Sequence, residues 1–119
     1  MENDFYYVYM LLCEDGSYYT GTTNNLKERF IKHSKGKGAK YTKTHKPIKF
    51  LSAWRVENIS IALKIEYYIK KQDKKIKTMF IENKRLLKKY FIKEYSELKN
   101  ISIKSVSNID KYNKLIYYK

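Results

Sequence analysis

Cysteine, proline and long apolar runs are scarce in this chain of 119 residues, which contains one Cys and one Pro. A lone Cys13 excludes an intramolecular disulfide framework and a zinc site made of several thiolates. A lone Pro47 gives no proline-rich linker, and a chain of this length forms one domain at most. The longest apolar run, 5–12, is less than half of the roughly 20 residues that a membrane-spanning helix needs. We therefore expect a single-domain cytoplasmic protein without membrane contact, associated with the nucleoid if it is bacterial.

Lys and Arg are absent from residues 1–26, although the whole chain holds 26 of them against 12 Asp and Glu, for a net charge of +14. In 27–49 and 64–93 the basic residues are interleaved with tyrosine and phenylalanine. Such a basic, aromatic-rich surface favours a polyanionic partner, and we expect DNA, with RNA as an alternative. An AT-rich genome would produce a similar composition without that function. The sequence leaves open whether a protein partner or a homodimer is involved.

Apolar patterning predicts strands and helices along the first 92 residues. Asn24 or Asn25 can cap the first helix and Gly36 ends it, while Ser60 can cap the second. The expected strands are 5–13, 18–22 and 48–57, the expected helices 26–35, 61–71 and 78–91, and the expected basic loop 36–47. We assign 1–92 to the domain and 93–119 to a C-terminal extension that is docked or partly ordered.

The turn between the first two strands decides which tyrosines share a face. A two-residue turn at Asp15-Gly16 would put Tyr9 and Tyr19 on opposite faces. A three-residue turn, with Gly16 in the left-handed conformation, pairs Tyr9 with Gly21 and brings both tyrosines to one face. We favour the three-residue turn and expect Gly21 to leave room for a ligand. The simpler alternative is that both tyrosines pack in the core.

The first expected helix carries two polar side chains beside its apolar face. At about 100° per residue, Arg29 and His33 flank the stripe that contains Leu26 and Phe30. Arginine is well shaped to bind a phosphate through paired donors, and histidine one turn away could share a proton there. The alternative is a solvated helix edge.

Glu66 lies on the expected apolar stripe of the second helix, which includes Leu63 and Ile69. A buried carboxylate needs a compensating cation. Lys70, four residues later, would make an ordinary ion pair. A divalent metal would take one or two protein carboxylates and fill its other sites with water and phosphate. The spacing leaves both alternatives open.

The basic loop and its neighbours are expected to contact phosphates, with a simply solvated loop as the alternative. The candidate nucleic-acid-binding residues are Lys27, Lys35, Lys37, Lys40, Tyr41, Lys43, His45, Lys46 and Lys70.

Two short tyrosine motifs carry a family resemblance. The chain has Tyr7-Val8-Tyr9 and, after nine residues, Tyr19-Thr20-Gly21, which resembles the paired motif of the GIY-YIG endonuclease superfamily. The pattern departs at Tyr7, where the family has Gly, and at Thr20, where it has Ile; the branch tolerates both strand positions. The run 13–29, followed by His33, 36–42 and Lys46-Pro47, is similar to the URI branch of small single-domain bacterial members, and the match covers about residues 5–85.

This resemblance implies an α+β fold with a small three-stranded antiparallel sheet flanked by about three helices. It implies a divalent-metal-dependent DNA endonuclease, structure-selective or weakly sequence-selective, in DNA repair, recombination or processing. The alternative is a non-catalytic nucleic-acid-binding module with the same fold. One Mg²⁺ or Mn²⁺ ion would be bound by Glu66, and the implied catalytic residues are Tyr9, Tyr19, Arg29, His33 and Glu66.

In this interpretation Tyr9 accepts the proton of the attacking water, and Tyr19 orients the water or the phosphate. A phenol with a pKa near 10 is only about one part in a thousand ionised at pH 7. Tyr9 therefore needs Arg29 to lower its pKa, or His33 to take the proton onward. An ionised Tyr9 predicts a cleavage rate that rises with pH well above neutrality.

Overall fold

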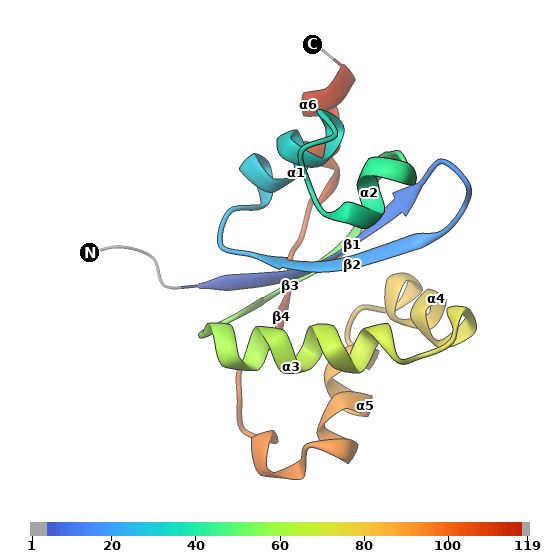
Figure 1. Cartoon of the computed structure of the whole chain (residues 1–119). Helices are drawn as coiled ribbons and strands as arrows, with labels where there is room; N and C mark the ends of the chain where they lie inside the picture. Colours follow the sequence, from blue (N-terminus) through green and yellow to red (C-terminus); the bar gives the residue numbers. More distant parts are fainter. Residues whose placement is uncertain (1–4, 118–119) are drawn as a thin grey trace.

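A four-stranded antiparallel sheet forms the middle layer of the computed structural model, which describes residues 5–117 (Figure 1). The strand order is β2-β1-β3-β4, so β2 is an outer strand. The predicted α+β class with an antiparallel sheet is confirmed, and the sheet gains a fourth strand too short for apolar patterning to predict. The strands are β1 (Tyr6–Cys13), β2 (Tyr18–Thr23), β3 (Pro47–Val56) and β4 (Lys104–Ser105).

Helices cover both faces of this sheet (Figure 1). Because successive strand residues point to opposite faces, each face has its own apolar core. Tyr9 and Phe50 belong to one core, and Val8 and Trp54 belong to the other. On the Tyr9 face lie α1 (Leu26–Ser34), α2 (Lys40–Thr44) and α6 (Asp110–Tyr117); on the Val8 face lie α3 (Ile59–Lys70), α4 (Lys74–Glu82) and α5 (Leu86–Glu94), followed by the short 3₁₀ helix η1 (Ser96–Leu98).

The β1–β2 turn has the three-residue form. Tyr9 pairs with Gly21 and Leu11 with Tyr19, and Gly16 has a φ of 85°. Tyr9 and Tyr19 therefore share a face, as predicted.

Three local features differ from the sequence prediction. The side chain of Asn58, not Ser60, caps α3 by accepting from the backbone N–H of Ile61 at 2.9 Å. The helix predicted over 78–91 is divided into α4 and α5, because Asn83 adopts an extended conformation after Glu82. The expected basic loop contains α2. The first two differences arise where an asparagine offers the backbone an alternative hydrogen bond or conformation.

The residues after α5 return to the sheet. Lys104 pairs with Arg55 across the outer side of β3, and Ile109 packs into the core beneath α1. The Asn113 side chain accepts from Phe50 N–H at 2.7 Å and donates to Phe50 O at 3.1 Å. Within residues 5–117, none of the helices is long and apolar enough to cross a membrane.

Candidate active site

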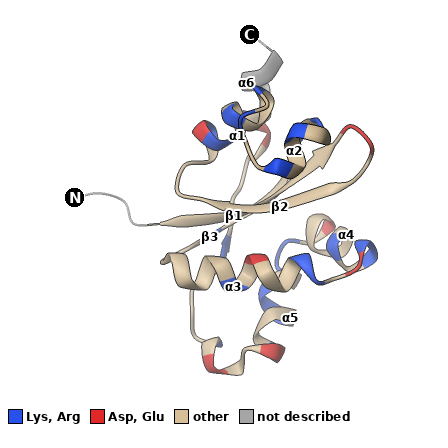
Figure 2. Ribbon diagram, in the orientation of Figure 1, with Lys and Arg blue, Asp and Glu red and all other residues tan. Residues whose placement is uncertain are grey.

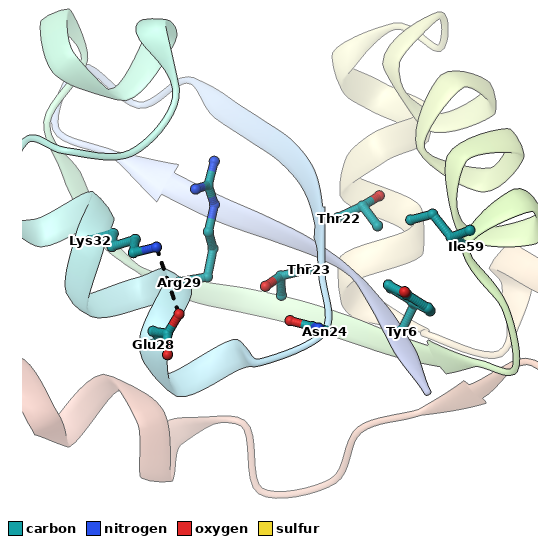
Figure 3. Close-up of a pocket in the computed structure, with 8 residues that line it drawn as sticks. All are labelled: Tyr6, Thr22, Thr23, Asn24, Glu28, Arg29, Lys32 and Ile59. Carbon is teal, nitrogen blue, oxygen red and sulfur yellow. Dashed lines mark ion pairs between the residues drawn. The ribbon is translucent and has the colours of Figure 1, made fainter. Parts of the chain in front are cut away.

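A cleft of about 330 Å³ wraps around strand β2 at the edge of the sheet. Figure 3 shows Arg29 and Thr23 on one side of this strand, and Thr22 with Ile59 on the other. Arg29 comes from α1, whereas Ile59 begins α3. The cleft therefore joins the two helix-covered faces of the sheet at one opening.

Tyr9 and His33 form a directed hydrogen-bond chain beside this cleft. Tyr9 Oη lies 2.8 Å from His33 Nε2, and His33 Nδ1 lies 2.7 Å from Thr42 Oγ1. Thr42 donates its single hydroxyl proton to Ala39 O at 3.0 Å, so it must accept from His33 Nδ1–H. His33 Nε2 is then the acceptor for Tyr9 O–H.

Burial sets the protonation of this pair, since both Tyr9 and His33 have no exposed surface. Burial raises the pKa of Tyr9 well above its usual value, and a hydrogen bond from Arg29 only partly opposes the shift. Burial, helped by the charge of Arg29, lowers the pKa of His33 to about 4. At neutral pH, therefore, the phenol keeps its proton and the imidazole is a neutral acceptor. Of the two routes expected to assist Tyr9, the lowering of its pKa by Arg29 is outweighed by burial, whereas His33 is positioned to take the proton.

Tyr19 packs against both members of the pair. Its ring centroid lies 6.2 Å from that of Tyr9 and 5.4 Å from that of His33. Tyr41 stacks on Tyr19 at 5.9 Å, and Lys70 Nζ of α3 lies 5.6 Å from the Tyr19 centroid. Tyr19 thus connects the Tyr9–His33 pair with the α3 side of the cleft.

Two glycines fit closely against these rings. A Cβ on Gly21 would lie 2.5 Å from Tyr9 Oη, and a Cβ on Gly38 would overlap the His33 imidazole. Glycine is required at both positions because a neighbouring ring occupies the space of a side chain. The expectation that Gly21 leaves room for a ligand is therefore wrong, since Tyr9 fills that space.

Glu66 reaches the same edge of the sheet from α3. Its Oε1 accepts a hydrogen bond from Thr22 Oγ1 at 2.5 Å, and its Oε2 lies 2.7 Å from Lys70 Nζ. The Glu66 side chain is 18% exposed. Leu63, expected on the same apolar stripe, is 52% exposed. Glu66 therefore lies at the border of the buried stripe and not within it.

This single carboxylate fits a magnesium-type ion, which takes one or two protein carboxylates and completes its shell with water and phosphate oxygens. Among the described residues, no group of three or more His, Cys, Asp or Glu side chains could hold a metal ion. Lys70 already neutralises Glu66 Oε2. The sequence offered Lys70 and a divalent metal ion as alternative partners of Glu66. Both would bind the same carboxylate oxygen, Oε2.

The predicted nucleic-acid-binding residues surround this region, and Figure 2 shows Lys and Arg on α1, α2 and the end of α3. Three of them have partners within the protein, and one of the three is Lys70, which pairs with Glu66. Tyr41 donates its hydroxyl proton to Ser17 Oγ at 2.6 Å and stacks on His45, whose Nε2 lies 3.7 Å from Asp15 Oδ2. These contacts hold α2 against the β1–β2 turn. The exposed members of the set are Lys27, Lys35, Lys37, Lys40, Lys43, Lys46 and Lys70.

Three residues of the site were not identified from the sequence. Thr22 holds Glu66, Thr42 holds His33, and Gly38 packs on His33. Gly38 carries a weak signal, because a glycine outside a tight turn indicates a close approach. The threonines carry none, since their partners are distant in the sequence.

Comparison with known proteins shows the family to which the chain belongs. Residues 5–80 match the family described as the GIY-YIG catalytic domain. The chain is 39% identical to the UPF0213 protein YazA of Bacillus subtilis over 99 residues, covering 82% of this chain and 100% of that protein. It is 42% identical to a UPF0213 protein of Fusobacterium nucleatum over 101 residues, covering 85% and 97%. The solution NMR structure of a UPF0213 protein from Bacillus halodurans is 37% identical and has a TM-score of 0.44, covering 66% of this chain and 83% of that one.

Proposed function

Since this chain belongs to the UPF0213 family of small bacterial proteins and carries a GIY-YIG catalytic domain, we propose that it is a divalent-metal-dependent endonuclease that hydrolyses phosphodiester bonds in DNA. The observation that supports this most directly is the hydrogen bond from Tyr9 to His33, beside a cleft that contains Arg29. A phenol, a neutral imidazole and an arginine are suited to proton transfer and charge stabilisation at a phosphate. Glu66 adds an acidic ligand at the same sheet edge.

Tyr9 and His33 act together on the attacking water. As the water oxygen bonds to phosphorus, the bond from phosphorus to the leaving oxygen breaks and the leaving oxygen keeps its electron pair. One water proton passes to Tyr9 Oη, and the phenolic proton passes to His33 Nε2 across the 2.8 Å hydrogen bond. The resulting imidazolium keeps its Nδ1–H on Thr42. No free phenolate forms, which removes the cost of ionising a buried tyrosine.

Arg29 controls access to the oxygen of Tyr9. Its Nε–H donates to Tyr9 Oη at 3.3 Å, which is long for a hydrogen bond. A phosphate in the cleft offers Arg29 a stronger, paired contact. When the guanidinium turns to the phosphate, a lone pair on Tyr9 Oη becomes available to the water. Tyr19, packed against both rings, keeps the pair aligned and orients the water or the phosphate.

Glu66 is the residue that would hold the metal. Thr22 fixes Oε1, so the oxygen open to exchange is Oε2, now paired with Lys70. When bound there, Mg²⁺ or Mn²⁺ would supply positive charge that stabilises the transition state of phosphodiester hydrolysis. Lys70, which pairs with Oε2, would be able to bind a phosphate of the DNA backbone if that ion pair opened.

The test is incubation with labelled single-stranded, duplex, flapped and branched DNA, and with RNA, in Mg²⁺, Mn²⁺ or EDTA. Tyr9→Phe and Glu66→Ala are compared with two matched controls on exposed positions, Tyr67→Phe and Glu82→Ala. We expect metal-dependent cuts that fall by about 10²–10⁴-fold in Tyr9→Phe, the usual contribution of a proton-transfer group. Glu66→Ala should lose the metal-dependent cleavage, and both controls should cut like the wild type.

Folding of each variant is checked by circular dichroism. If Tyr9→Phe and Glu66→Ala cut as well as the wild type, the cleavage comes from another protein. If the wild type binds DNA but cuts none of the substrates with either metal, the non-catalytic nucleic-acid-binding function replaces the nuclease.

A further inference from the structure

Three clefts follow one another from the candidate active site to the C-terminal extension. The active-site cleft shares Asn24 with a second cleft, which is also lined by Lys27. The second shares Tyr7 and Tyr112 with a third cleft of about 280 Å³, bounded by residues 104–107. The shared lining residues place the three clefts side by side, and this row of clefts is called the channel below.

One row of paired residues crosses the sheet beneath this channel. Tyr7 pairs with Thr23 of β2 and with Arg55 of β3, and Arg55 pairs with Lys104 of β4. Directly paired residues point to the same face, so all four lie on the face that also carries Tyr9. Three strand spacings of about 4.8 Å make the row roughly 14 Å wide. That width is the rise of about four nucleotides along one strand of duplex DNA, at about 3.4 Å each.

The far end of the channel is basic and has hydroxyl groups. Arg55, Lys104 and Lys111 line the third cleft together with Ser105 and Ser107. Among the described residues, the ion pairs involve Lys32, His45, Lys70 and Lys71, and none involves these three cations. The third cleft is therefore a concentration of positive charge that no acidic side chain of the described region neutralises by direct pairing.

Arg55 is also held in place for binding. Its guanidinium carbon lies 4.2 Å from the centroid of the Phe5 ring. Stacking on an aromatic face fixes the orientation of a guanidinium while its N–H donors remain directed outward in its plane. Lys111 Nζ lies 5.1 Å from the ring centroid of Tyr112, which likewise keeps the ammonium over the cleft wall.

We infer that a DNA strand whose phosphate lies at Arg29 continues along this channel, so that neighbouring phosphates bind Arg55, Lys104 and Lys111. The inference rests on the proposed function, which brings the strand to Arg29, and it extends that function to the segment after residue 93. The C-terminal extension is then part of the substrate-binding surface. Only phosphate contacts are involved, so this part of the site contributes affinity without reading sequence.

The test measures binding in EDTA, separately from cleavage. Fluorescence anisotropy with a labelled duplex gives the dissociation constant of the wild type and of Lys104→Gln/Lys111→Gln between 50 and 200 mM salt. Each phosphate contact contributes about 0.9 to the slope of log K against log salt. Losing two contacts should lower the magnitude of the slope by about 2 and weaken binding by about 10- to 60-fold at 0.1 M salt. Both lysines are exposed, so folding should be retained.

The matched control is Lys89→Gln/Lys93→Gln on α5, which removes the same charge from exposed positions on the other face of the sheet. It should keep the wild-type slope and bind within about twofold of the wild type, because only long-range charge is lost. Hydrogen exchange of the wild-type protein provides a second measurement without substitution, and the amides of residues 104–107 should be protected by DNA.

The outcomes separate this inference from the proposed function. The channel inference is refuted if Lys104→Gln/Lys111→Gln keeps the wild-type salt slope and affinity. It is also refuted if the α5 control loses as much affinity as that variant. Neither result would contradict cleavage by Tyr9 and Glu66. Unchanged hydrogen exchange at 104–107 on DNA binding would overturn it as well. If the wild type does not bind DNA, both the channel inference and the proposed nuclease function are refuted.

Discussion

Acid should destabilise this protein through one buried side chain, His33. Its pKa is lowered from 6.5 to about 4 by burial and by the charge of Arg29. Between these values the unfolded chain takes up a proton that the folded chain does not, so stability is complete above pH 6.5 and declines as the pH falls towards 4. The full shift corresponds to about 3 kcal/mol, of which about 2 kcal/mol is lost by pH 5.

Urea unfolding at pH 7.5 and pH 5.0, followed by circular dichroism, measures this loss. We expect the drop in unfolding free energy on acidification to be about 2 kcal/mol smaller in His33→Gln than in the wild type. Both proteins contain the same carboxylates, so the contribution of these groups cancels in the comparison. His45→Gln, which changes the partly exposed histidine, should keep the wild-type drop. An equal drop in the wild type and His33→Gln would refute the buried neutral imidazole, and with it the proton acceptor assigned to Tyr9.

Two further predictions concern the same hydrogen-bond chain. The first is measured under single-turnover conditions with chemistry rate-limiting. The cleavage rate should be level from pH 6 to 9, because Tyr9 stays protonated and His33 stays neutral in this range. A tenfold rise in rate per pH unit would instead support a free phenolate at Tyr9, as the sequence alone suggested. The second is that Gly38→Ala should lower the unfolding free energy by about 1–3 kcal/mol and reduce cleavage, because the alanine Cβ would overlap the His33 ring. If this variant unfolds thermally and cleaves DNA like the wild type, the His33 ring has room to move and the reasoning is wrong.

The sequence was sufficient to predict the hairpin and its shared tyrosine face. The turn ending in Gly16 has one register in which Tyr9 and Tyr19 lie together, and the structure has that register. Such a turn is local, so its residues contain the information needed to predict it. The apolar stripe of the first helix also placed His33 beside the core, where it is fully buried.

The remaining features depend on contacts between distant residues. Thr42 selects the tautomer of His33, and Thr22 fixes Glu66 from another element. β4 exists only because Lys104 meets Arg55 across β3. Two-residue strands and hydroxyl partners leave no periodic trace in a sequence, so patterning could not predict them.

The side-chain amide of Asn113 has a consequence for the edges of the sheet. β4 covers β3 at only two positions, and further along Asn113 donates to and accepts from the backbone of Phe50 as a neighbouring strand would. An uncovered strand edge is a template for pairing with another chain, which leads to aggregation. The C-terminal extension therefore blocks strand addition at β3, whereas β2, the other outer strand of the sheet, borders the cleft that contains Arg29.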